Sequence, residues 1–179
     1  MKRTALAGTA AAVLLAGAIA LPLFQPWRLV TGKVVDEAAP GTVPISMKPS
    51  SATPPTVSVA PPATPEVLAR GSLISHEHST SGQAVVLRLP DGSRVLRLEN
   101  LDTSDGPDLR VWLSDAEVRP GRAGWHVFDD GRYRSLGRLK GNQGNQNYPI
   151  PADVDLADFG SVAIWCDRFN VSFGAARLK

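Results

Sequence analysis

After Gly71, apolar residues recur at every second position, and no window keeps a helical period of 3.6 residues for ten residues. A period of two is typical of a strand that buries one face, because successive side chains point to opposite sides of a sheet. The first runs are Val85/Leu87/Leu89, the turn segment Pro90-Asp91-Gly92-Ser93, and Leu96/Leu98. Together they predict a β-hairpin.

Later segments repeat this spacing. They are Leu109/Val111/Leu113, the segment after the Asp129-Asp130-Gly131 turn, and Phe169/Val171/Phe173. Only the stretch from Asp153 to Phe159 suggests a helical turn. Several short strands separated by Gly, Pro and Asp turns predict an all-β fold with a single β-sandwich-like domain.

The N-terminal residues 5–24 hold no charged side chain. About 20 helical residues rising ~1.5 Å each match the ~30 Å hydrocarbon layer of a membrane. A cleaved secretory signal is the alternative, because Lys2-Arg3 is a basic start and Ala18-Ile19-Ala20 is a small-residue cleavage pattern. Apolar residues continue past that site, and Trp27 and Arg28 are typical of a membrane interface. We expect an uncleaved transmembrane anchor, and both interpretations send the rest of the chain across the membrane.

The chain therefore divides into an anchor or signal peptide (1–29), a proline-rich extracytoplasmic stalk (30–69) and a β-domain (70–179). Eight prolines between Ala38 and Pro65 stand among Ala, Thr, Ser and Val without an apolar period. This composition is typical of an extended spacer, which could reach up to about 90 Å. The expected location is the cell membrane, single-pass, with the globular domain outside the cytoplasm.

The net charge of +2 arises before the β-domain, which keeps 14 of the 19 basic and 14 of the 17 acidic residues. A neutral domain has no basic field to attract a polyanion, so no nucleic-acid partner is expected. The expected partners are the membrane, through the N-terminal segment, and an unknown redox or surface protein.

Cys166 is the only cysteine, so no disulfide and no multi-cysteine metal site can form within one chain. Val162, Ile164 and Cys166 share one parity and Trp165 has the other, which predicts the thiol on the inner or rim side of a strand. Two interpretations stay open. The residue is a small buried hydrophobe, or it is a redox group, because an exposed thiol outside the cytoplasm tends to oxidise.

Other sites for chemistry give weaker signals. His76 and His78 would lie on one face of an extended strand, about 7 Å apart, and could supply two metal ligands. A blue-copper centre is not expected, since neither His nor Met follows Cys166. The cofactor is unknown, with noncovalent haem as a candidate, because one axial ligand suffices and no Cys-x-x-Cys-His attachment exists. Hydrolase motifs are missing, so a redox or binding module is favoured over a turnover enzyme.

Two polar segments also have alternative interpretations. The amide-rich stretch from Gly141 to Pro149 predicts a loop, either a self-bonded turn or the lip of a ligand site. Arg132, Arg134, Arg138 and Lys140 share parity. On an unbroken strand they would form a cationic row, and otherwise they are an ordinary solvated face.

Four motifs follow one another along the β-domain. They are His78-Ser79-Thr80-Ser81-Gly82, Asp105-Gly106-Pro107-Asp108-Leu109, the run from Leu139 to Tyr148, and Ile164-Trp165-Cys166. With them, the chain resembles the DM-thirteen (DM13) electron-transfer domain family over about residues 70–178. The resemblance implies a β-sandwich with a redox-active cysteine, working as a bare thiol or through a bound group such as haem. It implies Cys166 as the redox candidate and His78 as an orienting or ligating neighbour, both of them tentative cofactor ligands.

We therefore expect a membrane-tethered extracytoplasmic redox or electron-transfer module that uses a single cysteine, as a thiol or with a bound group such as haem. The alternative is a non-redox cell-surface binding or adhesion module. In that case Cys166 is structural, and the loops after Ser104 and Gly141 contact the partner.

Overall fold

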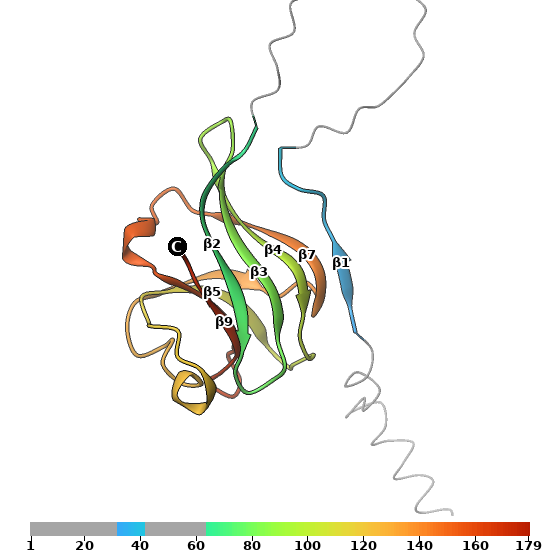
Figure 1. Ribbon diagram of the computed structural model, residues 1–179, viewed down its shortest axis with the longest axis vertical. Coiled ribbons are helices and arrows are strands. Elements are labelled where there is room, and N and C mark those ends of the chain that lie inside the picture. Colours follow the sequence, from blue (N-terminus) through green and yellow to red (C-terminus); the bar gives the residue numbers. More distant parts are fainter. Residues whose placement is uncertain (1–31, 42–63) are drawn as a thin grey trace, which may run out of the picture.

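The computed structural model describes residues 32–41 and 64–179. Its strands are β1 (Val34–Asp36), β2 (Glu66–Ser75), β3 (Ser81–Arg88), β4 (Arg94–Asp102), β5 (Leu109–Ser114), β6 (Tyr133–Arg138), β7 (Gln143–Ile150), β8 (Ser161–Cys166) and β9 (Val171–Arg177). They form one curled sheet in the order β1-β7-β4-β3-β2-β9-β8-β5-β6 (Figure 1). Two 3₁₀ turns, η2 (Gly121–Gly124) and η3 (Leu156–Asp158), complete the described elements. The all-β prediction is confirmed, and η3 lies where a helical turn was expected.

Strand β2 is the point at which the sheet folds over. Its first part, Glu66–Ser72, pairs with β3, and its last part, Leu73–Ser75, pairs with β9. Gly71 lies just before this change of partner, and a Cβ there would overlap the backbone carbonyl of Arg177. The missing side chain therefore lets the end of β9 approach β2 closely.

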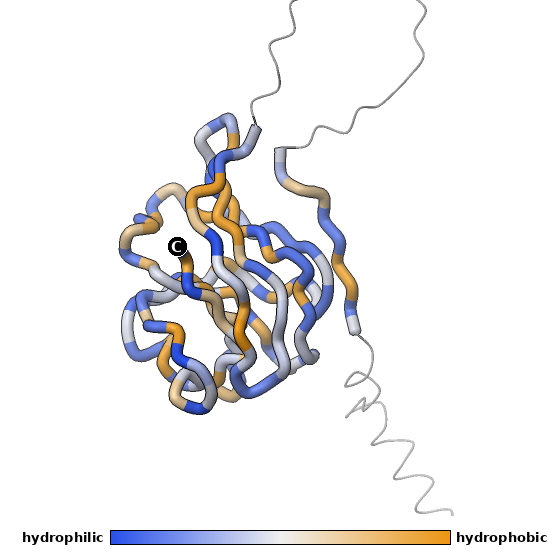
Figure 2. Tube along the Cα trace, viewed as in Figure 1, coloured by the Kyte–Doolittle hydropathy of each residue, from blue (hydrophilic) through white to orange (hydrophobic). Residues whose placement is uncertain are grey.

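The two halves of the sheet pack their inner faces against each other. The main core cluster includes Val86, Leu96 and Leu98 from one half and Val111, Ile164, Cys166 and Phe173 from the other. In Figure 2 hydrophobic residues follow the central strands, and hydrophilic residues lie on the loops. Burial of apolar area at about 25 cal/mol per Å² is the main stabilising contribution of such a core.

The predicted β3–β4 hairpin is confirmed, but the inner face of β3 differs from the expected parity. Ala84 and Val86 belong to the core cluster, whereas Val85 and Leu87 are buried on the outer face. All four residues are apolar, so a period of two cannot select the face of β3. The choice is made by β4, whose Leu96 pairs with Val86 across the sheet.

Two other expectations were wrong. The amide-rich segment is not a loop, because Gln143–Ile150 is strand β7, paired with β4 on one side and β1 on the other. Phe169 is not a strand residue, since it is 63% exposed in the turn before β9 begins at Val171. In both cases tertiary context overrides a local pattern.

Strand β1 comes from the part of the chain that the sequence placed in the stalk. It runs parallel to β7, with Asp36 in register with Asn145 (Figure 1). Gly144 has a φ of +97°, and a Cβ there would overlap the carbonyl of Val35. A glycine is therefore needed for β1 to come this close.

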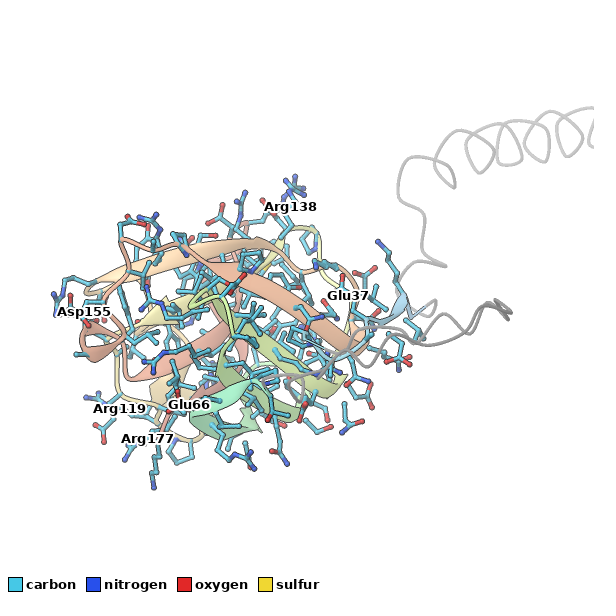
Figure 3. All side chains as sticks on the ribbon, turned by 90° about the horizontal axis from the view of Figure 1, so that it is seen from above. Glu37, Glu66, Arg119, Arg138, Asp155 and Arg177 are labelled. Carbon is cyan, nitrogen blue, oxygen red and sulfur yellow. The ribbon has the colours of Figure 1, made fainter. Side chains whose placement is uncertain are left out.

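Glu37 and Lys140 hold the end of β1 against the sheet. Lys140 Nζ donates to both carboxylate oxygens of Glu37 at 2.7 and 3.0 Å. The backbone N–H of Asn147 donates to the same carboxylate at 2.6 Å. Figure 3 shows Glu37 where β1 meets the rest of the sheet. Partial burial raises the pKa of Glu37, but these donors and the nearby Arg97 outweigh it, so the pKa is lowered from its ordinary value.

The expected anchor at 1–29 lies outside the described residues, as does the part of the expected stalk at 42–63. Within the ranges 32–41 and 64–179, no helix is long and apolar enough to cross a membrane.

We predict that Glu37→Gln loosens β1. The neutral amide loses the charge-assisted bonds to Lys140, so the backbone N–H groups of β1, and those of β7 that face β1, should exchange faster with solvent. The free energy of unfolding should fall by about 1 kcal/mol or less. Because the pKa of Glu37 is lowered, its contribution is complete above the ordinary carboxyl pKa of 4.5 and disappears as the pH falls through the folded-state value.

The matched control is Glu66→Gln, because Glu66 forms an exposed pair with Arg88 at 2.9 Å away from β1. Unchanged exchange of β1 in Glu37→Gln, or an equal effect of Glu66→Gln, would show that the carboxylate does not hold this strand.

Candidate functional site

All four motifs lie at one end of the curled sheet. Because the neighbouring strands of the main sheet are antiparallel, the connections after β2, β4, β6 and β8 emerge at the same end. These connections are residues 76–80, 103–108, 139–142 and 167–170. Four connections spread over residues 76–170 are thus gathered around the end of β8, where Cys166 is the last residue.

Hydrogen bonds join these connections to one another. The Thr80 hydroxyl lies 2.8 Å from the Thr103 hydroxyl and 3.0 Å from the carbonyl of Phe173. Asn142 Nδ2 donates to the Thr103 carbonyl at 2.8 Å, and the Thr103 N–H donates to the Asn142 carbonyl at 2.9 Å. The first, second and third motif regions are therefore joined by hydrogen bonds between buried polar groups.

Cys166 is a free thiol with no exposed surface. It pairs with Leu109 on β5 and with Val171 on β9, and its side chain joins the main core cluster. Trp165 faces the other way, into a second cluster with Trp112. The predicted inner position of the sulfur and the opposite direction of Trp165 are both confirmed.

His78 approaches the core through an aromatic ring. Its imidazole lies 3.9 Å from the ring of Phe173, measured between centroids, and Phe173 is a member of the cluster that contains Cys166. Its Nε2 lies 2.6 Å from a carboxylate oxygen of Glu77. The side chain is about one-third exposed. His78 therefore packs against the core cluster that contains Cys166, with its Nε2 directed at Glu77.

His76 does not share a face with His78, so the expected pair of metal ligands is wrong. Strand β2 ends at Ser75, and the chain bends at His76. His76 Nε2 lies 3.1 Å from the carbonyl of Arg119 and donates to it, and Nδ1 lies 2.8 Å from the Ser172 hydroxyl. Both ring nitrogens are occupied by structural bonds. The described residues hold no group of three or more His, Cys, Asp and Glu side chains that could bind a metal.

Burial lowers the pKa of His76, and the hydrogen bond to the Arg119 carbonyl offsets this only in part. The imidazole is therefore neutral at physiological pH. It links the end of β2 to the loop that carries η2, which covers the outer face of β8 and β9.

A pocket of about 470 Å³ opens at this end of the sheet, next to the start of β5. It is lined by Lys33, by the second motif (Asp105, Gly106, Pro107, Asp108, Leu109) and by Arg138, Leu139, Lys140, Gly141 and Asn142. Leu109 contributes to this wall and is also the neighbour of Cys166 across the β5–β8 pair. Cys166 itself does not line the pocket, so Leu109 is the residue that connects the two.

The residues at this end do not fit a haem bound through Cys166. Haem needs largely apolar faces and an axial ligand that reaches the iron. The pocket is lined by Lys33, Lys140, Arg138, Asp105 and Asp108, and the sulfur is enclosed by the core.

Ion pairs tie the second motif to the turn after Cys166. Arg110 Nη2 lies 3.2 Å from Asp108, and Arg110 Nε lies 3.4 Å from Asp167. Arg138 lies 3.4 Å from Asp108. The alternative of an unbroken cationic row is not realised, because a β-bulge at Leu136 interrupts β6. The four cations are each paired with an acid; they are Arg132, Arg134, Arg138 and Lys140.

The amide side chains of β7 serve the structure. Gln146 Oε1 accepts from the Tyr148 hydroxyl at 2.7 Å, and Gln146 Nε2 donates to the Gly141 carbonyl at 2.6 Å. Burial raises the pKa of Tyr148 to about 12, a hydrogen bond with the Lys140 backbone opposes this, and the charge of Glu37 adds to it. These amides support the pocket floor from below.

A family model described as "Electron transfer DM13" matches residues 72–178, more than half of the chain. The chain belongs to the DM13 family. The recognition made from the four motifs is confirmed, and the matched region of the DM13 domain begins in β2 and ends just after β9. Comparisons with curated proteins and with solved structures gave no match.

One group of side chains in the DM13 domain was missed from the sequence. Trp112 stacks on Trp165 with ring centroids 4.9 Å apart and on Tyr133 at 4.0 Å. The sequence held one signal for this group. Trp112 and Trp165 stand at the outward-facing positions of their alternating runs, where polar side chains are usual. Large aromatic residues there indicate a second buried layer.

We predict that His76 makes the stability of the DM13 domain depend on pH. Its folded-state pKa lies below the ordinary 6.5, so the unfolded chain takes up the proton first as the pH falls. The free energy of unfolding should be highest above the ordinary pKa of 6.5 and should decrease as the pH falls below it. Denaturant titrations between about pH 8 and pH 5 measure this decrease.

His76→Gln should cost about 1–3 kcal/mol and flatten this pH dependence, because buried hydrogen bonds are lost with the titrating ring. His126→Gln, which changes a histidine bonded to the Asn170 carbonyl, should keep the dependence. An equally steep pH dependence in His76→Gln would contradict the assignment.

Proposed function

We propose that the DM13 domain is an electron-transfer module whose redox group is Cys166, held outside the cytoplasm by an N-terminal membrane segment. The observation that carries this proposal is the convergence of all four family motifs on the sheet end where β8 finishes at Cys166. The family motifs thus lie around the end of the strand that carries the only cysteine of the chain.

The thiol itself is favoured over a haem-linked cysteine. The neighbouring pocket is polar and the sulfur is enclosed, so an iron porphyrin has no suitable site there. Enclosure also protects the thiol from disulfide exchange and from small oxidants, which need direct access to sulfur. We therefore expect this enclosed thiol to exchange electrons rather than to take part in disulfide exchange or oxygen transfer.

The membrane tether rests on the sequence of the N-terminal region. Residues 5–24 are uncharged and long enough to span a bilayer, and Trp27 and Arg28 follow as interface residues. The redox partner would then be a protein of the same membrane or of the space outside it.

A binding or adhesion module without redox chemistry is the second candidate. It is supported by the complete burial of Cys166 among aliphatic neighbours, which is the ordinary environment of a structural cysteine. The pocket beside Leu109 would then be the contact site for a partner.

We predict that Cys166→Ser and Cys166→Ala both abolish the loss of electrons from the purified protein in an oxidative titration. Both variants should fold, since serine and alanine fit the space of the thiol. The serine variant should be less stable by about 1–3 kcal/mol, because its hydroxyl is buried in an apolar cluster. Circular dichroism checks the fold and denaturant titration checks the stability.

Native Cys166 should also react slowly with alkylating reagents and completely after unfolding, because the sulfur has no exposed surface. Wild-type protein that loses no electrons to the oxidant, or titrates like Cys166→Ala, would reject the redox proposal and leave the binding module.

A further inference from the structure

The pocket at the motif-bearing end of the sheet takes one wall from the segment that leads into β1. The Lys33 N–H donates to Asn142 Oδ1 at 2.6 Å, and the Lys33 carbonyl accepts from the Gln143 N–H at 3.3 Å. Gly141 makes this approach possible, because a Cβ there would overlap the Lys33 carbonyl. Lys33 lies outside the family region 72–178, so the N-terminal part of the chain completes a pocket that the DM13 motifs begin.

The charged side chains that line this pocket carry a net charge of +1, from three cations and two acids. The acids already have donors within the protein. Asp108 lies 3.2 Å from Arg110 and 3.4 Å from Arg138, and Asp105 accepts the Gly106 N–H at 2.9 Å. The positive charge that remains favours an anion in the pocket.

Two of the three cations keep free donors. Lys140 Nζ uses its three N–H groups on the two oxygens of Glu37 and on the Asn147 carbonyl, at 2.7, 3.0 and 2.7 Å. Arg138 meets Asp108 through one Nη, and its side chain is 69% exposed, so other N–H groups of the guanidinium are free. In the part of the chain that the structure describes, the Lys33 ammonium takes part in no ion pair or hydrogen bond.

We propose that this pocket binds a small molecule that carries a phosphate group, held by Lys33 and Arg138. A phosphate group carries a charge of about −1.5 to −2 near neutral pH and three acceptor oxygens, so it can accept from an ammonium and a guanidinium at once. The pocket volume of about 470 Å³ lies in the range of about 300–1,000 Å³ that is typical of small-molecule sites. The site goes beyond the proposed function, because it does not depend on the chemistry of Cys166.

The bound phosphate also holds β1 on the sheet. Lys33 directly precedes β1, and its backbone is bonded at the pocket wall only while β1 lies along β7. A ligand that contacts the Lys33 ammonium therefore binds the docked form of β1 more tightly than an undocked form, and shifts the chain toward docking. By linkage, a change that loosens β1 weakens phosphate binding.

The test uses the full chain in dodecyl maltoside, titrated with inorganic phosphate while sodium chloride keeps the ionic strength constant. Calorimetry should give a dissociation constant of roughly 1 mM. Hydrogen exchange should then report on β1, where the Glu37 N–H donates to the Asn145 carbonyl at 2.9 Å. At ten times the dissociation constant, exchange of this N–H should slow about tenfold, because only the undocked form exchanges. Acetate, with one charge and two oxygens, should bind more weakly.

Lys33→Gln should weaken phosphate binding about tenfold and remove the protection of β1, since a charged donor is lost. Lys33→Arg keeps the charge and should restore both. Lys179→Gln is the matched control, because Lys179 is an exposed lysine just after β9, at the opposite end of the sheet, and it should match wild type. Gly144→Ala tests the linkage without changing the pocket lining, since its Cβ would overlap the Val35 carbonyl and loosen β1. It should also weaken phosphate binding.

The outcomes separate this site from the proposed function. Wild-type affinity in Lys33→Gln, or slower exchange that sodium chloride alone reproduces, would overturn the site. Phosphate binding that leaves the exchange of β1 unchanged would overturn the coupling, and equal affinity for acetate would overturn the phosphate assignment. None of these results bears on the oxidative titration of Cys166. Protein in which Cys166 loses no electrons but phosphate still protects β1 would reject the redox proposal and support this site.

Discussion

The fold depends on β2 being hydrogen-bonded to both halves of the sheet. This change of partner requires the backbone of β9 to approach β2 where Gly71 has no side chain. Once β2 is shared, the sheet closes over one core, and antiparallel neighbours bring the connections that carry the family motifs to a common end. Positions as distant as Thr80 and Asn142 then become hydrogen-bonded through Thr103. The site is a consequence of this topology rather than of any single loop.

Burial decides what chemistry is open to Cys166. A thiol with no exposed surface cannot attack a disulfide or coordinate a porphyrin that lies outside the core. The same enclosure leaves electron exchange through neighbouring groups as the remaining route. On the inner side the thiol meets Leu109 and Val171, and across its own strand it is one peptide unit from Trp165. A redox function of Cys166 is therefore compatible with its burial if electrons pass across β8 and the partner does not contact the sulfur.

The sequence predicted those features that local pattern determines. The direction of Cys166 followed from the alternation along β8, and the hairpin followed from a turn between two apolar runs. The face of β3 did not follow, because its four apolar residues fit both parities and only the pairing of Leu96 with Val86 decides between them. The amide segment was misread because pairing on both sides makes β7 a strand despite its glycines. The separation of His76 from His78 depends on Ser172 and Arg119, which lie far away in sequence.

Strand β1 changes the picture of how the domain would stand at a membrane. A passive stalk over residues 30–69 would allow a reach of tens of ångströms, yet Val34–Asp36 form strand β1 of the sheet and Glu37 is fixed by Lys140. With the anchor proposed for residues 1–29, only four residues precede Val34, and extended chain spans at most about 3.6 Å per residue. The end of the sheet that holds the family motifs also holds the start of β1, because β1 runs parallel to β7, and Lys33 lines the pocket there. The proposed tether would therefore keep the pocket end of the DM13 domain close to the membrane surface, where a membrane-bound redox partner can reach it.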